Sequence, residues 1–146
     1  MPRLVVVGGR GWENEQVLDV LDRGRWTRQS VFEAAGLSSG GLSRLVANAR
    51  ALLMPSFAEG YGLPLVEALT LGTPVVATDA AVFREVTQGK ALYFGPLDGA
   101  AWTSAISELA DANSHTSRAA REAARQFAPP TWPGYFEAVG RFLDAI

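Results

Sequence analysis

Short apolar runs alternate with helical periodicity along most of the chain, and this alternation constrains the fold more than any other feature. Residues 4–7 form a continuous, largely β-branched apolar run that ends in two glycines, which is typical of a strand buried on both faces. Similar runs stand at residues 31–32, 51–54, 74–77 and 91–94. Strands that alternate with helices predict an α/β fold with a doubly wound, Rossmann-like parallel sheet.

Helices are expected where apolar residues recur every three or four positions. One such segment, residues 13–23, ends at Gly24, a residue type that commonly caps a helix carboxyl terminus. Another contains residues 42–46, and a third begins near Pro64, which suits a first helical turn. Beyond Asp98 the strand pattern stops, and additional carboxyl-terminal helices are predicted at residues 100–109, 118–127 and 135–143.

Length and composition exclude several classes of protein. A chain of 146 residues can bury one ordinary core, so we expect a single domain over residues 1–146. The net charge of −2 gives no electrostatic footprint for nucleic acid. The chain has no cysteine, which fits a reducing compartment, and no apolar stretch is long enough for a secretion signal or a membrane span. We therefore expect a cytoplasmic protein; membrane association is left open.

Residues 55–67 join a predicted strand to a predicted helix, the place where open α/β sheets bind ligands. Gly60 and Gly62 flank Tyr61, so the backbone can turn tightly there and a ligand can approach it closely. The free N–H groups near Gly62 and Leu63 and the positive end of the helix dipole suit a diphosphate.

Two glutamates flank this junction. Glu67 lies roughly one helical turn beyond it, within reach of a diol such as a ribose, and Glu59 stands before it, near the other end of such a ligand. Each residue also has a plain structural interpretation: a carboxylate that complements the helix dipole for Glu67, a solvated loop acid for Glu59, and turn residues for the glycines. Their joint occurrence at one strand-to-helix junction favours a binding site.

Residues 59–67 read Glu-Gly-Tyr-Gly-Leu-Pro-Leu-Val-Glu. They resemble the signature of two glutamates separated by seven residues in glycosyltransferase family 4, the group 1 retaining glycosyltransferases, and in related GT-B enzymes such as mannosyl-, glucosyl- and sucrose-type transferases. Residues 51–56 and 67–78 resemble the elements on either side of that signature. The resemblance extends from Leu4 to about Leu143 and identifies the chain as similar to the carboxyl-terminal, donor-binding domain.

The resemblance implies transfer of a hexose from a nucleoside-diphosphate sugar to an acceptor hydroxyl, with retention at the anomeric carbon. It assigns donor-sugar hydroxyls and the catalytic position to Glu59, and the donor ribose to Glu67. By the same matching, the backbone amides of Gly60, Tyr61, Gly62 and Leu63 hold the sugar and the diphosphate. No cofactor besides the donor is implied.

Departures from the family pattern limit what residues 1–146 are expected to do alone. The amino-terminal acceptor domain is missing, and so is the strand whose Arg and Lys clasp the diphosphate. Arg10 is a candidate substitute for donor binding, with a solvated arginine as its plain alternative. A metal site is not expected, because the chain has no cysteine and one histidine, His115, expected at the surface near a helix start. We expect weak donor binding and no measurable catalysis.

Two other functions stay open at this stage. The sequence Gly9-Arg10-Gly11 after the first strand suggests a dinucleotide-binding oxidoreductase domain, although Asn14 replaces the third glycine and Glu33 matches the acidic ribose ligand only loosely. A non-enzymatic, flavodoxin-like binding module complete at this length is the second alternative.

Overall fold

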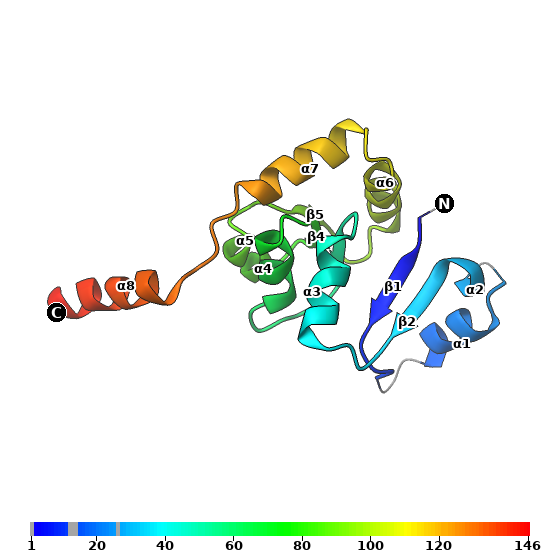
Figure 1. Cartoon of the computed structure of the whole chain (residues 1–146), viewed down its shortest axis with the longest axis horizontal. Coiled ribbons are helices and arrows are strands. Elements are labelled where there is room, and N and C mark those ends of the chain that lie inside the picture. Colours follow the sequence, from blue (N-terminus) through cyan, green and yellow to red (C-terminus); the bar gives the residue numbers. More distant parts are fainter. Residues whose placement is uncertain (1, 12–14, 26) are drawn as a thin grey trace. The chain divides into compact units, whose positions relative to one another are not determined.

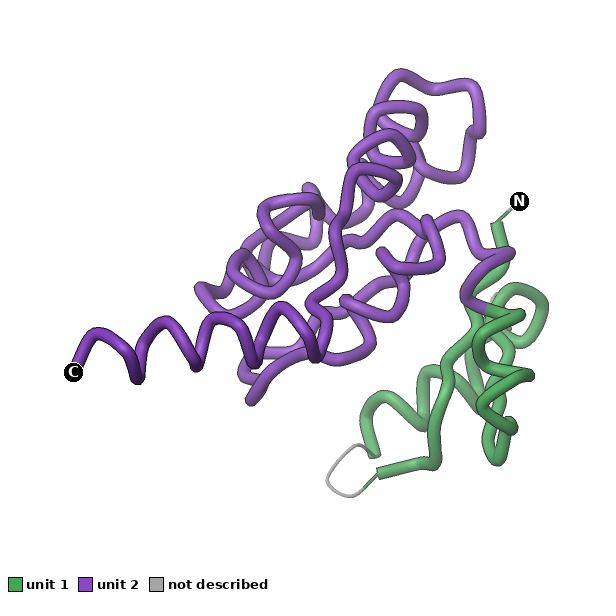
Figure 2. Tube along the Cα trace, turned by 60° about the vertical axis from the view of Figure 1, so that its left-hand side comes forward, with its two compact units in different colours: residues 1–45 green, residues 46–146 purple. Residues whose placement is uncertain are grey.

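The computed structural model describes residues 2–11, 15–25 and 27–146 and combines parallel sheets with helices (Figure 1). The chain separates into two compact units, residues 1–45 and residues 46–146 (Figure 2). Each unit contains its own sheet, and every strand pairing in both sheets is parallel. The α/β class predicted from the alternating pattern is therefore confirmed.

The first unit contains a two-stranded sheet in which Leu4 lies opposite Val31 and Val7 lies opposite Ala34. Its elements are β1 (Leu4–Val7), α1 (Glu15–Arg23), α2 (Thr27–Ser30) and β2 (Val31–Ala34). The short helix α2 was not predicted. Gly24 follows α1 as expected, and its N–H donates to the carbonyl of Val20 (3.0 Å). The helix start expected at Glu13 lies outside the described residues, and so does Asn14, which replaces the third glycine of the dinucleotide-binding pattern.

The second unit contains the sheet β3-β4-β5. Its strands are β3 (Leu52–Met54), β4 (Val75–Thr78) and β5 (Leu92–Phe94). The helix α3 (Ser39–Ala47) leads into this unit. The later helices are α4 (Leu63–Thr70), α5 (Ala81–Val86), α6 (Gly99–Ala110), α7 (His115–Arg125) and α8 (Trp132–Asp144).

The central strand β4 is buried along its whole length and separates two apolar clusters. Val75 and Ala77 face one cluster, which includes Leu65, Ala68 and Leu69 of α4 and Phe83 of α5. Val76 faces the other, with Trp102 and Leu109 of α6. Successive side chains of a strand point to opposite faces, so both faces of β4 need apolar residues, and Val75, Val76 and Ala77 supply them before the strand ends at buried Thr78. The continuous run at 74–77 reflects this requirement.

Helix bounds differ from the predicted ones where polar caps extend the helices. Helix α7 begins at His115, three residues before the predicted start, because the Ser114 side chain accepts a hydrogen bond from the N–H of Ser117 (3.0 Å). His115 is exposed at this helix start, as expected. Likewise α8 begins at Trp132, where Thr131 accepts from the N–H of Gly134 (3.3 Å).

Candidate functional site

The segment 55–62 connects the carboxyl end of β3 to the amino end of α4. Pro55 has no N–H to continue the ladder of β3, so the strand stops at Met54. The segment that follows is largely exposed. Because β3 and β4 are parallel, this loop leaves the sheet at its carboxyl edge, where open α/β sheets bind ligands.

Gly62 opens α4 in the left-handed backbone region, with φ 89° and ψ 42°. A Cβ at this position would lie 3.0 and 3.2 Å from ring atoms of Phe83 and 3.4 Å from Leu65. Conformation and space therefore both require glycine here. The carbonyl of Gly62 accepts a hydrogen bond from the N–H of Leu65 (3.0 Å), which fixes the first turn of the helix.

Helix α4 presents its amino end without a side-chain cap. Its first turn contains no acidic residue, and Pro64 has no N–H to be satisfied. The buried side chains of Leu65, Ala68 and Leu69 anchor the opposite face of the helix in the core. An anion in front of Leu63 would therefore meet a fixed helix end with the N–H of Leu63 and a positive dipole.

Glu59 and Glu67 lie on either side of this helix start, and both are exposed. Ser56 donates from Oγ to Oε1 of Glu59 (3.3 Å), so the loop acid has one local partner. Glu67 is the fifth residue of α4 and stands beyond the first turn. The alternative in which Glu67 complements the helix dipole from the first turn is therefore wrong.

The loop exposes apolar side chains as well as backbone. Tyr61 and Leu63 are 46% and 60% exposed, and Phe57 is 72% exposed. Sequence reasoning singled out the amides of residues 60–63 but not Phe57. An exposed aromatic residue two positions before Glu59 is the signal that could have drawn attention to it.

A polar network supports the loop from α5, and sequence reasoning missed it. Arg84 donates from Nε to Oδ1 of Asp79 (2.6 Å) and from a terminal nitrogen to Oδ2 (3.0 Å), and its guanidinium lies 4.4 Å from the ring centroid of Tyr93. The Tyr93 hydroxyl hydrogen-bonds Thr87, whose Oγ1 is also 2.6 Å from the carbonyl oxygen of Phe83. The network thus holds the residue that packs against Gly62.

The same ion pair shifts two ionisation equilibria. The hydrogen bond from Arg84 lowers the pKa of Asp79 below its ordinary value, and the hydrogen bond to Asp79 raises the pKa of Arg84. Both groups are therefore charged at neutral pH, and the pair is maintained there.

Arg10 lies in the first unit, where two carboxylates hold it. It donates to both carboxylate oxygens of Glu33 (3.0 and 2.7 Å) and of Asp22 (3.0 and 2.7 Å). These hydrogen bonds, first those with Glu33 and then those with Asp22, raise the pKa of Arg10, while Arg10 lowers the pKa of each carboxyl. A role in donor binding stays a prediction, and it would require Arg10 to exchange partners.

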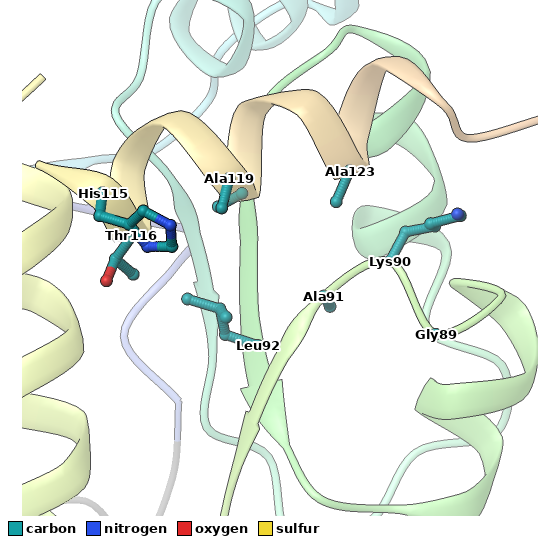
Figure 3. Close-up of a pocket in the computed structure, with 9 residues that line it drawn as sticks. Gly89, Lys90, Ala91, Leu92, His115, Thr116, Ala119 and Ala123 are labelled. Carbon is teal, nitrogen blue, oxygen red and sulfur yellow. The ribbon is translucent and has the colours of Figure 1, made fainter. Parts of the chain in front are cut away.

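An apolar groove of about 320 Å³ lies elsewhere, between α7 and the start of β5 (Figure 3). His115 and Thr116 line it from the helix and Leu92 lines it from the strand. Strands β3, β4 and β5 all run in the same direction. The amino end of β5 therefore lies at the opposite end of the strands from the 55–62 loop, which follows the carboxyl end of β3. The groove is therefore not part of the predicted donor site.

The described residues contain no group of three or more His, Cys, Asp or Glu side chains that could hold a metal ion. Among the same residues, no helix combines the length and apolar character that crossing a bilayer requires.

Comparison with known proteins places this geometry in context. The family described as Glycosyl transferases group 1 matches residues 2–112. The Serotype-specific mannosyltransferase WbdA of Escherichia coli is 36% identical over 91 residues, 62% of this chain and 11% of the relative. The O-antigen chain mannosyltransferase RfbU of Salmonella typhimurium is 44% identical over 68 residues, 47% of this chain and 19% of the relative. The chain thus spans less than a quarter of either relative.

A solved structure, sucrose-phosphate synthase from Thermosynechococcus elongatus, superposes with a TM-score of 0.73 at 21% identity. The superposition covers 98% of this chain and 38% of that one. At this identity the likeness shows the fold alone. It confirms the predicted Rossmann-like, GT-B architecture.

Proposed function

The chain belongs to the glycosyl transferases of group 1, and from that premise we propose that it forms the donor-binding half of a retaining glycosyltransferase. The full-length enzyme would move a hexose from a nucleoside-diphosphate sugar to an acceptor hydroxyl. The observation that carries the proposal is the uncapped, glycine-initiated amino end of α4, which stands between two exposed glutamates at the carboxyl edge of a parallel sheet.

Each part of the site has a role in this proposal. The amides of residues 60–63 and the end of α4 hold the diphosphate, and they stabilise its charge as the bond to the anomeric carbon breaks. Glu67 accepts hydrogen bonds from the ribose hydroxyls. Glu59 contacts the hydroxyls of the donor sugar. Retention is inferred from the resemblance of residues 59–67 to the family signature.

Mannose is the hexose that the relatives favour, since the printed names of WbdA and RfbU describe mannosyltransferases. The acceptor belongs to a partner domain, an amino-terminal one in the family pattern, and residues 1–146 leave the acceptor unidentified. No metal or other cofactor enters this proposal. The cytoplasm is the proposed location, on the ground that the chain has no cysteine.

The alternative of a dinucleotide-binding oxidoreductase is weakened by the surroundings of Glu33. Both oxygens of that carboxylate accept a hydrogen bond from Arg10, so a ribose would have to share them with the guanidinium or displace it. Membership of a transferase family also argues against a self-contained flavodoxin-like module.

Ligand-observed NMR tests the proposal with GDP-mannose, UDP-glucose, UDP-N-acetylglucosamine, NADH and inorganic phosphate. We expect binding of one sugar nucleotide in about the millimolar range, since residues 1–146 form only part of the site. Binding of NADH without any sugar nucleotide would reject the donor-half assignment and support the oxidoreductase.

A further inference from the structure

Glycine at position 62 permits the conformation that opens α4 but does not by itself impose it. A glycine has no Cβ and adopts positive and negative φ about equally readily. Gly62 stands in the left-handed region, with φ 89° and ψ 42°. Its conformation therefore depends on what packs against it, and the neighbour supplied by the adjacent helix α5 is Phe83 (Figure 1).

The Phe83 ring occupies the space beside the backbone of Gly62. Phe83 is 0% exposed, and its Cε1 and Cδ1 atoms lie 3.0 and 3.2 Å from the place that a Cβ of residue 62 would take. Leu65 closes the same space from α4, with its Cδ1 at 3.4 Å. The start of α4 thus rests on a ring that is packed in the core.

Hydrogen bonds to its carbonyl oxygen hold Phe83 in place. The N–H and the hydroxyl of Thr87 both donate to this oxygen (3.1 and 2.6 Å). A threonine hydroxyl has one hydrogen, so the hydrogen bond between Thr87 and Tyr93 takes its hydrogen from the Tyr93 hydroxyl. Tyr93 belongs to β5, which pairs with the central strand β4. The position of Phe83 is therefore tied to the sheet.

The peptide unit between Gly62 and Leu63 turns this packing into a direction. Its carbonyl accepts a hydrogen bond from the N–H of Leu65 (3.0 Å), so the carbonyl points into α4. The carbonyl and the N–H of a trans peptide unit point in opposite directions. The N–H of Leu63 therefore points out of the helix end, toward the proposed place of the diphosphate.

We propose that Phe83 is a positioning residue for the donor diphosphate: its ring keeps Gly62 left-handed and so keeps the N–H of Leu63 directed at a phosphate oxygen. This inference rests on the proposed function, because it concerns the same helix end. Phe83 is buried and acts through Gly62 rather than by contact with the donor. The buried side chains of Ala68 and Leu69 hold the second turn of α4, so Phe83 acts on the helix start.

NMR titrations with GDP-mannose and with inorganic pyrophosphate test the proposal. Phe83→Leu leaves room beside Gly62, so the helix start becomes freer and has to be ordered when a phosphate binds. We expect the dissociation constant of each ligand to rise roughly fivefold to tenfold, a part of what one hydrogen bond to a charged group contributes. The factor should be the same for both ligands, because both contain a diphosphate.

Leu69→Val is the matched control. Leu69 belongs to the same core cluster and is 1% exposed, so its truncation also lowers stability, but it lies in the second turn of α4, away from Gly62. Both dissociation constants should stay within about twofold of the wild type. Glu67→Ala separates the two parts of the site, since it should weaken GDP-mannose and not pyrophosphate, which has no ribose.

Amide hydrogen exchange of Leu65 in the ligand-free protein is a second readout. The N–H of Leu65 is protected by the carbonyl of Gly62, so freeing Gly62 exposes it. Its exchange, measured relative to exchange in β4, should accelerate at least about threefold in Phe83→Leu. The same ratio should stay unchanged in Leu69→Val, where only the general stability of the unit falls.

The outcomes separate this inference from the proposed function. Wild-type affinity for both ligands in Phe83→Leu, an unchanged exchange ratio for Leu65, or equal weakening in Leu69→Val would overturn the positioning role and leave the proposed function standing. If the wild type binds neither ligand up to about 10 mM, the proposed function is rejected and this inference with it.

Discussion

Replacing Gly62 by alanine is expected to destabilise the second unit more than the same change at other loop glycines. Gly62 combines a positive φ of 89° with a buried site in which a Cβ would lie 3.0 Å from the Phe83 ring. Gly72 has a positive φ of 74° but open space around the Cβ position. Gly60 has open space too and no positive φ. The three glycines therefore separate backbone strain from steric overlap.

The expected magnitudes follow from these differences. All three Gly→Ala changes restrict the unfolded chain similarly, so Gly60→Ala is the reference. Gly72→Ala should cost about 1–2 kcal/mol more than this reference, from the left-handed backbone alone. Gly62→Ala adds overlap with Phe83, worth a further ~1–3 kcal/mol. The total for Gly62→Ala is therefore about 2–5 kcal/mol relative to Gly60→Ala.

Urea unfolding followed by far-UV circular dichroism measures the three free energies of unfolding. Phe83→Leu in the Gly62→Ala background should recover part of the loss, since a smaller side chain leaves room for the new Cβ. If the free energies of unfolding of Gly62→Ala and Gly60→Ala agree within about 0.5 kcal/mol, Gly62 is not the constrained start of α4 that the structure indicates.

Three further changes test the supporting interactions. Because Arg84 lowers the folded pKa of Asp79, the ion pair stabilises the fold at pH values above the unfolded pKa, and this contribution is lost as pH falls through the folded pKa. In urea unfolding at pH 7, the free energy of unfolding should therefore be higher for the wild type than for Asp79→Asn. The two free energies should converge as the pH falls below the ordinary pKa of 3.8. Tyr93→Phe should lower the free energy of unfolding by about 0.5–1.5 kcal/mol in the same assay, since Thr87 loses one hydrogen-bond partner. An unchanged free energy would show that the Tyr93 hydroxyl does not support the network. Arg10→Met leaves the carboxylates of Asp22 and Glu33 close together without the cation that both bind, so amide hydrogen exchange should accelerate in β1 and β2. Exchange in α4, which belongs to the second unit, should stay unchanged. Equal acceleration in both units would contradict their independence.

The parts of the fold that could be predicted from sequence are those encoded locally. The apolar run at 74–77 predicts a strand buried on both faces, and β4 packs apolar side chains on both faces at Val75, Val76 and Ala77. The glycines at 60 and 62 indicate a tight strand-to-helix turn, and Gly62 adopts the left-handed conformation that makes it necessary.

Interactions between distant residues could not be predicted in this way. Periodicity identifies strands but not which edges pair, so the division of the strands between two sheets was not foreseen. The contact of Phe83 with Gly62 spans about twenty positions, and α5 is too short to show a helical pattern. The carboxylates that hold Arg10 stand 12 and 23 residues away from it. Such pairs depend on tertiary packing.

The most direct test of the central claim is to map bound GDP-mannose on the backbone amides by ¹H–¹⁵N correlation NMR, in the wild type, Glu67→Ala and the control Glu122→Ala. Glu122 lies on the exposed surface of α7, outside the proposed site. We predict shifts concentrated at residues 60–63 and the first turn of α4, lost in Glu67→Ala and retained in Glu122→Ala. Shifts confined to the groove between α7 and β5, or binding that survives Glu67→Ala unchanged, would contradict a donor site at this helix end.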